Sequence, residues 1–400
     1  MKDRVESLLC RLIREVERHI VVKNNVAYVV DPVFGIVRNR VNAEICKTLM
    51  RLDSRNPLIG KIINFLLKNQ NEDGSWNEIH TNYNQPSALV TSFVGEALLM
   101  ALKIFPRNKL EKSLNMAKDY VLSQEKSPGY FVKSKQYIAD HLNVDASCGA
   151  FLAEYGKKFS DYECIKAARR AAERVCSYQF QNGVYPYTTD KGNYHYPLNI
   201  PCIHYQGVTM YYLAKIESIL REDWIKKSLL SGAEWLSSVQ KKDGKFDWSK
   251  SGLMFAYYLS GAYAFAFSSF VYVSKWDKKY LKNAELCLNA LEENIDGLVL
   301  RWEKSSWLSF PISIFTVTKT ALLGEYPLSH RMFRFGYGLY RQIARRRFAY
   351  NVDYKLFRLL CRILKISAST VEPSKNYPDM FMTSEVLDCL SYTYKSGELL

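Results

Sequence analysis

The sequence is poor in cysteine, and its first residues do not have the pattern of a secretory signal. Nine cysteines occur among 400 residues, an odd number, and no two of them form a Cys-x-x-Cys pair. A disulfide scaffold is therefore excluded, and free, mostly buried thiols in a reducing compartment are expected. The first twenty residues spread their charges through an amphipathic pattern, and no apolar stretch follows them. We therefore expect no secretory signal and a cytoplasmic protein.

The chain also lacks the composition of a disordered, collagenous or low-complexity protein. Hydrophobic residues make up 48% of it and charged residues 24%, which is typical of a globular protein. The net charge of +15 is concentrated in residues 331–365, which hold ten Lys or Arg and one acid, Asp353. Because the rest is only mildly basic, and no nucleic-acid motif accompanies the charge, we expect no nucleic-acid partner.

The basic segment 331–365 interleaves arginines with aromatic residues. We expect it to belong to a basic helical extension, residues 326–400, packed on a main domain formed by residues 1–325. Its functional interpretation is peripheral contact with an anionic membrane or an acidic partner. The alternative is an ordinary solvated helical cap. A second candidate for membrane contact, the uncharged run at 251–274, is long enough to cross a bilayer. It falls in register with an internal repeat, which favours a buried helix instead.

A short pattern recurs along the chain: an apolar helix, Gln, three residues, then Gly-x-aromatic. In chain order the copies start at positions 70, 124, 179, 240 and 292. The copies at 70, 179 and 240 are clear, the copy at 124 has one extra residue, and the copy at 292 is degenerate. Their spacings of 54, 55, 61 and 52 residues are nearly constant, which indicates a repeat architecture. The glycine ends the helix because it adopts the left-handed conformation at low cost, and the aromatic residue can fold back on the helix end.

Each unit of about 55 residues reads as a partly exposed helix, a glycine turn, a loop and an almost wholly apolar helix. Such hairpins cannot bury their inner faces alone. We therefore predict an all-α protein, an α/α toroid in which five to six hairpins close into a ring. The helix at 4–18 and the stretch 311–323 are the candidates for closing it.

The Gln70-x3-Gly74-x-Trp76 unit resembles the repeat of terpenoid cyclases and of protein prenyltransferase β-subunits, which are α/α toroids. The resemblance covers roughly residues 50–325. It implies isoprenoid chemistry, but the motifs that carry this chemistry are not preserved. The proton-donor Asp-x-Asp-Asp motif is represented only by Asn143-Val-Asp145-Ala, and an Asp-rich magnesium motif is absent. A zinc site could be imagined from Asp145, Cys202 and His204, but its spacing is not that of the family. We expect no metal and no cofactor.

Polar and aromatic residues gather in the loops that follow each Gly-x-aromatic unit. Four of the six histidines lie there. In a toroid these loops surround one mouth of the barrel, where aromatic faces can stack on sugar rings while polar groups take the hydroxyls or a carboxylate. The candidate substrate-binding residues are Trp76, His80, Tyr83, Asp140, Asn143, Tyr187, His195, Tyr205, Trp248, Arg301 and Trp302. The expected ligand is a small molecule or an oligosaccharide.

The predicted working cluster contains His141, Asp145, Tyr194 and His204, with Arg301. His141 or Tyr194 would act as the base, His204 and Arg301 would bind a substrate carboxylate, and Asp145 would orient a partner. Asn143 and Asp145 have an alternative interpretation, as caps of the helix that starts near Ala146.

The leading function is an enzyme acting on a polar, uronate-containing glycan, as a lyase, epimerase or hydrolase. The alternatives are an isoprenoid cyclase or transferase with altered acids, and a non-catalytic binding toroid.

Overall fold

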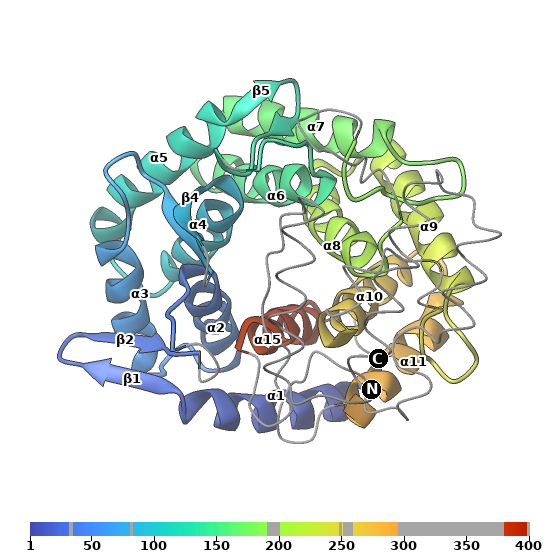
Figure 1. The fold of residues 1–400 in the computed structure, drawn as a ribbon, viewed down its shortest axis with the longest axis horizontal. Helices are drawn as coiled ribbons and strands as arrows, with labels where there is room; N and C mark the ends of the chain where they lie inside the picture. The colour runs from blue at the N-terminus through green and yellow to red at the C-terminus, as the bar shows by residue number, and fades with distance from the viewer. Residues whose placement is uncertain are drawn as a thin grey trace, which may run out of the picture.

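The computed structural model describes residues 1–31, 35–80, 83–135, 137–189, 201–247, 250, 259–294 and 380–397. In this part of the chain six helices form a closed inner ring (Figure 1). They are α2 (Asn39–Leu52), α4 (Ala88–Ala101), α6 (Leu142–Phe159), α8 (Ile203–Leu220), α10 (Leu259–Val273) and α15 (Met380–Lys395). Each packs against the next, and α15 packs against α2, which closes the circle.

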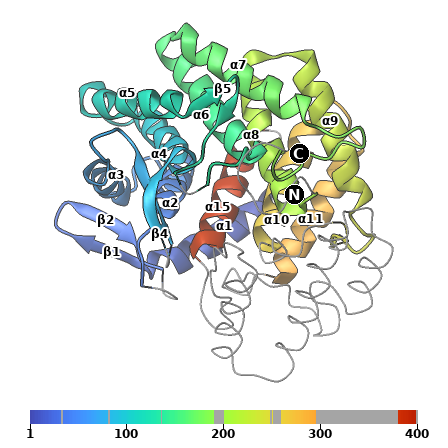
Figure 2. The same ribbon diagram turned by 45° about the horizontal axis from the view of Figure 1, so that its top comes forward.

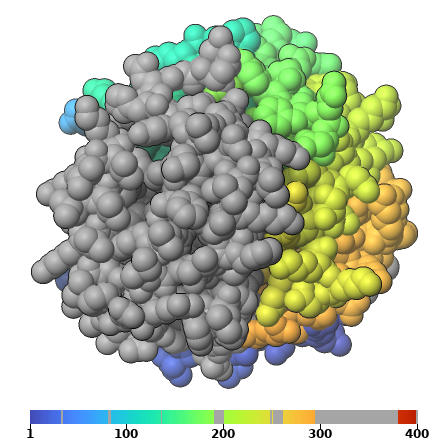
Figure 3. Space-filling model, turned by 45° about the vertical axis from the view of Figure 1, so that its right-hand side comes forward, coloured from blue at the N-terminus to red at the C-terminus, as the bar shows by residue number. Residues whose placement is uncertain are grey.

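A second layer of helices surrounds this ring. These outer helices are α1 (Lys2–Glu17), α3 (Leu58–Lys68), α5 (Arg107–Ser123), α7 (Tyr162–Ser177), α9 (Asp223–Ser238) and α11 (Tyr280–Asn294). They alternate with the inner helices along the chain, and Figure 3 shows α7, α9 and α11 as a continuous outer wall with α1 below them. The predicted fold class, an all-α toroid of helical hairpins, is confirmed.

The difference between the two layers follows from their residues. Helix α7 buries one small-residue stripe, which includes Ala167, Ala168, Ala171 and Ala172, and leaves its charged face in water. Helix α4 instead buries almost every residue, because neighbours surround it.

The repeat fixes each outer helix to the next. Gln179 donates from Nε2 to the carbonyl of Gly183 at 3.0 Å and to that of Ser228, on the next outer helix, at 2.9 Å. Ser228 returns a hydrogen bond to Gln179 Oε1. Gln70 and Gln240 make the same pair of carbonyl contacts in their own units. The glutamine side chain therefore joins consecutive units, which explains its recurrence.

The repeat glycines are required by both backbone angle and space. Gly183 has a φ of 89°, and a Cβ there would lie 2.1 Å from the carbonyl oxygen of Ser231. The other glycines of the repeat that the structure describes also have positive φ and lie against a carbonyl of the next outer helix: Gly74, Gly129 and Gly244. A side chain at these positions would force consecutive outer helices apart.

Short antiparallel hairpins lie between an outer helix and the following inner helix. They are β1 (Ile20–Lys23) with β2 (Val26–Val29), β3 (Trp76–His80) with β4 (Tyr83–Ser87), and β5 (Glu125–Ser127) with β6 (Tyr130–Phe131). In the second hairpin, Trp76 pairs with Ser87 and His80 with Tyr83. These connectors lie at the end of the ring where the inner helices begin.

The ring is closed by a helix that the sequence analysis did not expect in that place. Figure 2 shows α15 between α2 and α10, inside α1. The prediction assigned its residues to an extension packed on the toroid, and this is corrected for Met380–Lys395. The proposed closing stretch 311–323 lies outside the described residues, and the boundary between 1–325 and 326–400 otherwise stays a prediction. The predicted helix at 4–18 is found as α1, where Arg4 donates to Asn289 of α11 at 2.6 Å.

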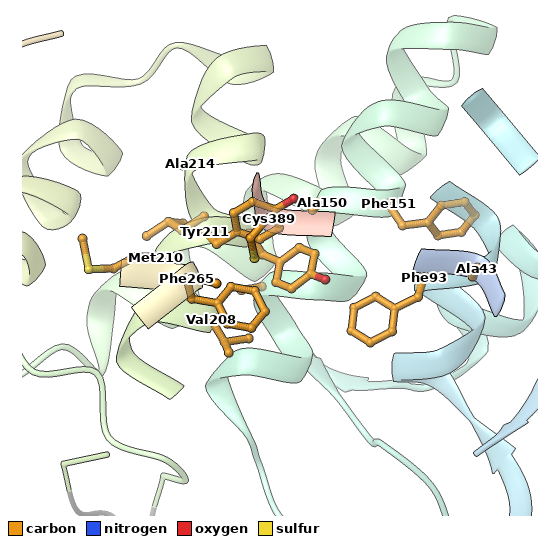
Figure 4. Packing of buried hydrophobic residues seen from close by; sticks show 14 of the residues in the cluster. Ala43, Phe93, Ala150, Phe151, Val208, Met210, Tyr211, Ala214, Phe265 and Cys389 are labelled. Atoms are coloured by element: carbon orange, nitrogen blue, oxygen red, sulfur yellow. The ribbon is translucent and has the colours of Figure 1, made fainter. Parts of the chain in front are cut away.

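Aromatic side chains cross the interior of the ring. Phe93 of α4 stacks on Tyr212 of α8 with ring centroids 5.5 Å apart, and Tyr211 lies 5.4 Å from Phe265 of α10. Figure 4 shows Phe93 directed from its helix toward the side on which Tyr211 and Phe265 lie. The first contact joins two inner helices that are not neighbours in the ring. None of the helices in the described ranges has the length and apolar character needed to cross a bilayer.

Candidate functional site

The mouth at which the inner helices begin carries a wall of four ring side chains, all of them predicted from the sequence. His141 precedes α6, Tyr187 lies in the connector to α8, and His204 and Tyr205 lie in the first turn of α8. The ring centroids of His141 and Tyr187 are 4.9 Å apart, those of Tyr187 and Tyr205 are 4.4 Å apart, and those of Tyr205 and His204 are 4.9 Å apart. We call these four residues the mouth wall.

His141 is held in one tautomer. Its Nδ1 lies 2.7 Å from the carbonyl oxygen of Ala139, so Nδ1 carries the hydrogen and Nε2 carries the lone pair. Burial and the nearby Lys133 ammonium lower the pKa of His141 to about 4. His141 is therefore neutral at pH 7, in the protonation state that a general base requires.

A carboxylate from the closing helix faces the other end of the wall. Glu385 Oε2 of α15 lies 4.0 Å from His204 Nε2. Arg40 of α2 contacts Glu385 Oε1 and donates to Glu44 Oε1 at 2.8 Å. Burial raises the pKa of Glu44, although Arg40 opposes this rise.

Gly261 of α10 leaves room for the His204–Glu385 approach. A Cβ at this position would lie 2.6 Å from Glu385 Oε2 and 3.1 Å from His204 Cε1. The sequence analysis did not identify Arg40, Glu44 or Glu385. The signal that was available is the presence of charged residues in segments with buried-helix character.

His80 belongs to a charged group on the β3–β4 hairpin. Its Nε2 lies 3.2 Å from Glu78 Oε1, which also accepts from Lys133 Nζ at 2.9 Å. Burial would raise the pKa of Glu78, but Lys133 and His80 hold it well below its usual range. Burial lowers the pKa of His80. The ring of His80 lies 6.1 Å from that of Phe381 of α15, so this group borders the same mouth.

Asp145, which was predicted to orient a catalytic partner, makes a backbone contact of the repeat. Its Oδ1 accepts from the backbone nitrogen of Phe131 at 2.7 Å. The fourth residues of α4 and α8, Thr91 and Gln206, accept in the same way from the nitrogens of Trp76 and Tyr185. Asp145 therefore fills a recurring position of the repeat, between α6 and α7.

Asp140 lies against Asp145 in the same interface. Arg174 of α7 donates from Nε to Asp140 Oδ2 at 2.9 Å, and its Nε is 4.0 Å from Asp145 Oδ2. Asp140 Oδ1 and Asp145 Oδ2 are buried without a donor among the described residues. Burial and the neighbouring Asp140 carboxyl raise the pKa of Asp145 well above its usual value. Asp145 therefore holds a proton more readily than an ordinary aspartate does.

Of the remaining candidates, Trp76 and Asn143 are described by the structure, and the others lie outside the described residues. Trp76 is fully buried and donates from Nε1 to the carbonyl of Leu66 at 2.7 Å, so it packs the repeat and is not a sugar platform. Asn143 is buried in the first turn of α6, and its Oδ1 has no donor in the described part of the chain. The following predictions lie outside the described residues: Tyr194, His195, Trp248, Arg301, Trp302, the side chain of Tyr83 and the basic segment 331–365.

A second charged cluster lies deeper in the ring and was not predicted. Lys47 of α2 contacts Glu96 of α4 at 2.9 Å and Asp388 of α15 at 3.0 Å, and all three side chains are almost completely buried. Lys215 of α8 contacts Glu96 at 2.8 Å, and Arg51 contacts Asp388 at 2.6 Å. The described residues contain no group of three His, Cys, Asp or Glu arranged to hold a metal ion.

No family model and no curated protein matches this chain. Several solved structures are similar to it. An unsaturated glucuronyl hydrolase specific for heparin is 14% identical, with a TM-score of 0.57, over 85% of this chain and 96% of the other. A variant of the type II terpene cyclase MstE from Scytonema, in complex with geranylgeranyl dihydroxybenzoate, is 11% identical with a TM-score of 0.58, over 100% and 99%. A sugar epimerase from a ruminal bacterium is 13% identical with a TM-score of 0.57, over 74% and 87%. At these identities the similarity shows the α/α-toroid fold, which sugar-acting and isoprenoid-acting enzymes share.

Proposed function

We propose that this protein is an enzyme that acts on a polar, uronate-containing glycan bound at the mouth where the inner helices begin. The observation that carries the proposal is the mouth wall of His141, Tyr187, Tyr205 and His204, with Glu385 facing its end. Aromatic faces stack on the C–H side of sugar rings, and imidazole and carboxylate groups exchange protons with hydroxyls or with acidic carbons.

His141 is the residue we assign as the base. Its Nδ1 hydrogen is directed to the Ala139 carbonyl, and the ring is neutral at pH 7, so Nε2 can accept a proton. In a uronate the hydrogen on the carbon beside the carboxylate is the most acidic carbon-bound hydrogen, and a nearby cation favours its removal. Lys133 and Arg40 are described cations at this mouth, and Arg301 remains the predicted carboxylate ligand.

The charges in the ring argue against the isoprenoid alternative. Cyclisation of a prenyl chain proceeds through carbocations, which aromatic faces stabilise and neighbouring cations destabilise. In this protein, arginine and lysine side chains already lie over aromatic rings of the inner helices. Arg40 lies 4.7 Å from the ring centroid of Phe93 and 4.4 Å from that of Phe381, and Lys47 lies 5.8 Å from that of Phe93. Asp145, the remnant of the acid motif, faces Arg174 and Phe131.

The test is incubation of the purified protein with a panel of acidic oligosaccharides and prenyl diphosphates, followed by mass spectrometry of the products. A shortened, unsaturated or epimerised saccharide is expected, and His141→Ala should abolish its formation. His19→Ala is the matched control, because His19 lies between α1 and β1. A cyclised or transferred prenyl product would refute the proposal, and so would the absence of turnover with every saccharide.

A further inference from the structure

One carboxylate oxygen at the edge of the mouth holds two separate parts of the chain. Asp140 Oδ2 accepts from Arg174 Nε of α7 at 2.9 Å and from Thr189 Oγ1 at 2.7 Å. The carbonyl of Asp140 also accepts from the backbone nitrogen of Thr189 at 3.0 Å. Asp140 is fully buried. We call Asp140, Arg174 and Thr189 the Asp140 clamp.

The clamp is next to the mouth wall in sequence on both sides. Asp140 immediately precedes His141, and Thr189 follows Tyr187 by two residues. Between them, His141 and Thr188 pair as an isolated antiparallel bridge. The edge-on contact of His141 with Tyr187, at 4.9 Å and 74°, therefore lies between backbone segments that the clamp fixes to one another and to α7.

We propose that Asp140 is a positioning residue, which sets the distance and angle between the His141 and Tyr187 rings without touching the substrate. Because its charge acts on Arg174 and Thr189, it holds the base against the sugar platform through the backbone. The geometry of Arg174 supports this role, because its Nε lies 2.9 Å from Asp140 Oδ2 and 4.0 Å from Asp145 Oδ2. The consequence for catalysis rests on the proposed function, whereas the effect on the two rings does not.

The same helix supplies a matched control. Arg170, one turn before Arg174 on α7, donates to Glu125 at 2.8 and 2.6 Å, and Gly129 donates its nitrogen to the same carboxylate. This link also ties a connector to α7. The hydrogen bonds that Glu125 accepts from Arg170 and Gly129 do not involve His141 or Tyr187. Glu125→Gln therefore removes an equivalent carboxylate–guanidinium pair away from the wall.

The experiment measures the ring resonances of His141 in the full, ligand-free chain by NMR, with histidine labelling. Because an aromatic ring shifts the resonances of its neighbours, Tyr187→Ala defines the values without the contact. Asp140→Asn and the milder Thr189→Val should move the His141 resonances toward those values, whereas Glu125→Gln should leave them unchanged. Thr189→Val keeps the Arg174 pair, so it provides the test even if Asp140→Asn fails to fold.

Activity provides the second measurement. With a substrate found as above, Asp140→Asn should lower kcat by about 10- to 100-fold, with KM changed much less, because misplaced groups slow the reacting step. Unchanged His141 resonances in both folded variants would overturn the inference. Equal effects of Glu125→Gln and Asp140→Asn on the resonances would also overturn it. Shifted resonances in a protein that turns over no acidic glycan would refute the proposed function and leave the clamp standing.

Discussion

Asp388 on the last inner helix contacts two cations of the first inner helix, Lys47 at 3.0 Å and Arg51 at 2.6 Å. Burial would raise the pKa of Asp388, but Lys47, Arg51 and Lys215 hold it well below its usual range. The ring is thus closed by a buried ionic contact between residues more than 300 positions apart in the sequence, in addition to apolar packing.

Removal of this charge should destabilise the protein strongly. Asp388→Asn would leave Lys47 and Arg51 buried with too little negative charge, at a cost of about 3–5 kcal/mol. Urea unfolding followed by circular dichroism measures this loss. The control is Asp119→Asn, which removes an exposed partner of Lys118 and should cost less than about 1 kcal/mol. Similar losses in the two variants would show that the deep cluster does not hold α15 in place.

Gly183→Ala tests the repeat. The substitution combines a φ of 89° with a Cβ only 2.1 Å from the Ser231 carbonyl oxygen. The left-handed angle alone costs about 1–2 kcal/mol, and the contact adds to this. In the control, Gly60→Ala in α3, the nearest atom is 3.4 Å away, and the helix gains from alanine. The thermal midpoint should fall in the first variant and stay level or rise in the second; the reverse order would contradict the assigned role of the repeat glycines.

The raised pKa of Asp145 makes a prediction about pH. The pKa of Asp145 is raised in the fold, chiefly by burial and then by Asp140, so the folded protein binds a proton that the unfolded chain releases. This contribution is fully present below the ordinary aspartate pKa and is lost as the pH rises through the folded value. Asp145→Asn mimics the protonated form and should therefore be more stable than the wild type near pH 7, with no advantage near pH 3. Chemical unfolding at both pH values measures the difference, and destabilisation at pH 7 would show that Asp145 acts as a carboxylate.

If His141 is the base, the enzyme should stay active at an unusually low pH. Because the pKa of His141 is lowered to about 4, the ring stays able to accept a proton well below the ordinary histidine range. The kcat/KM of the saccharide reaction should fall on the acid side with a midpoint near 4. A midpoint between 6 and 7 that disappears in His204→Gln would assign the base to His204 instead.

Gly261 offers a test of the His204–Glu385 approach. A methyl group at this position would lie 2.6 Å from Glu385 Oε2. Gly261→Ala should therefore displace the carboxylate and lower turnover about tenfold or more, and a thermal melt of the variant measures the stability lost when the buried carboxylate moves away from Arg40. Full activity in this variant would remove the His204–Glu385 pair from the reacting centre.

The fold could be predicted because each repeat unit is marked by a short sequence pattern. Gln179 and Gly183 recur as they do because one side chain bridges two carbonyls and one φ angle requires glycine. Helix α15 carries no such unit. Its polar residues Ser384, Glu385 and Asp388 face partners on α2 and α8, and these contacts across the ring cannot be read from the local sequence.

The site was predicted only in part, for a related reason. Loop position alone was enough to place His141, Tyr187, His204 and Tyr205 around one mouth. The role of an aspartate or glutamate depends instead on the groups that its carboxylate contacts in the fold. Its position in the sequence does not show which groups these are. Asp145 faces a backbone nitrogen and an arginine, whereas Glu385 faces His204 at the mouth from a helix far away in the sequence.

The most direct test of the account is a crystal structure of the His141→Ala variant with an acidic oligosaccharide that the wild type converts. The account predicts a sugar ring stacked on Tyr187 or Tyr205, with its reacting carbon beside the position vacated by the His141 ring. A saccharide bound elsewhere on the toroid, with the mouth wall uncontacted, would contradict it.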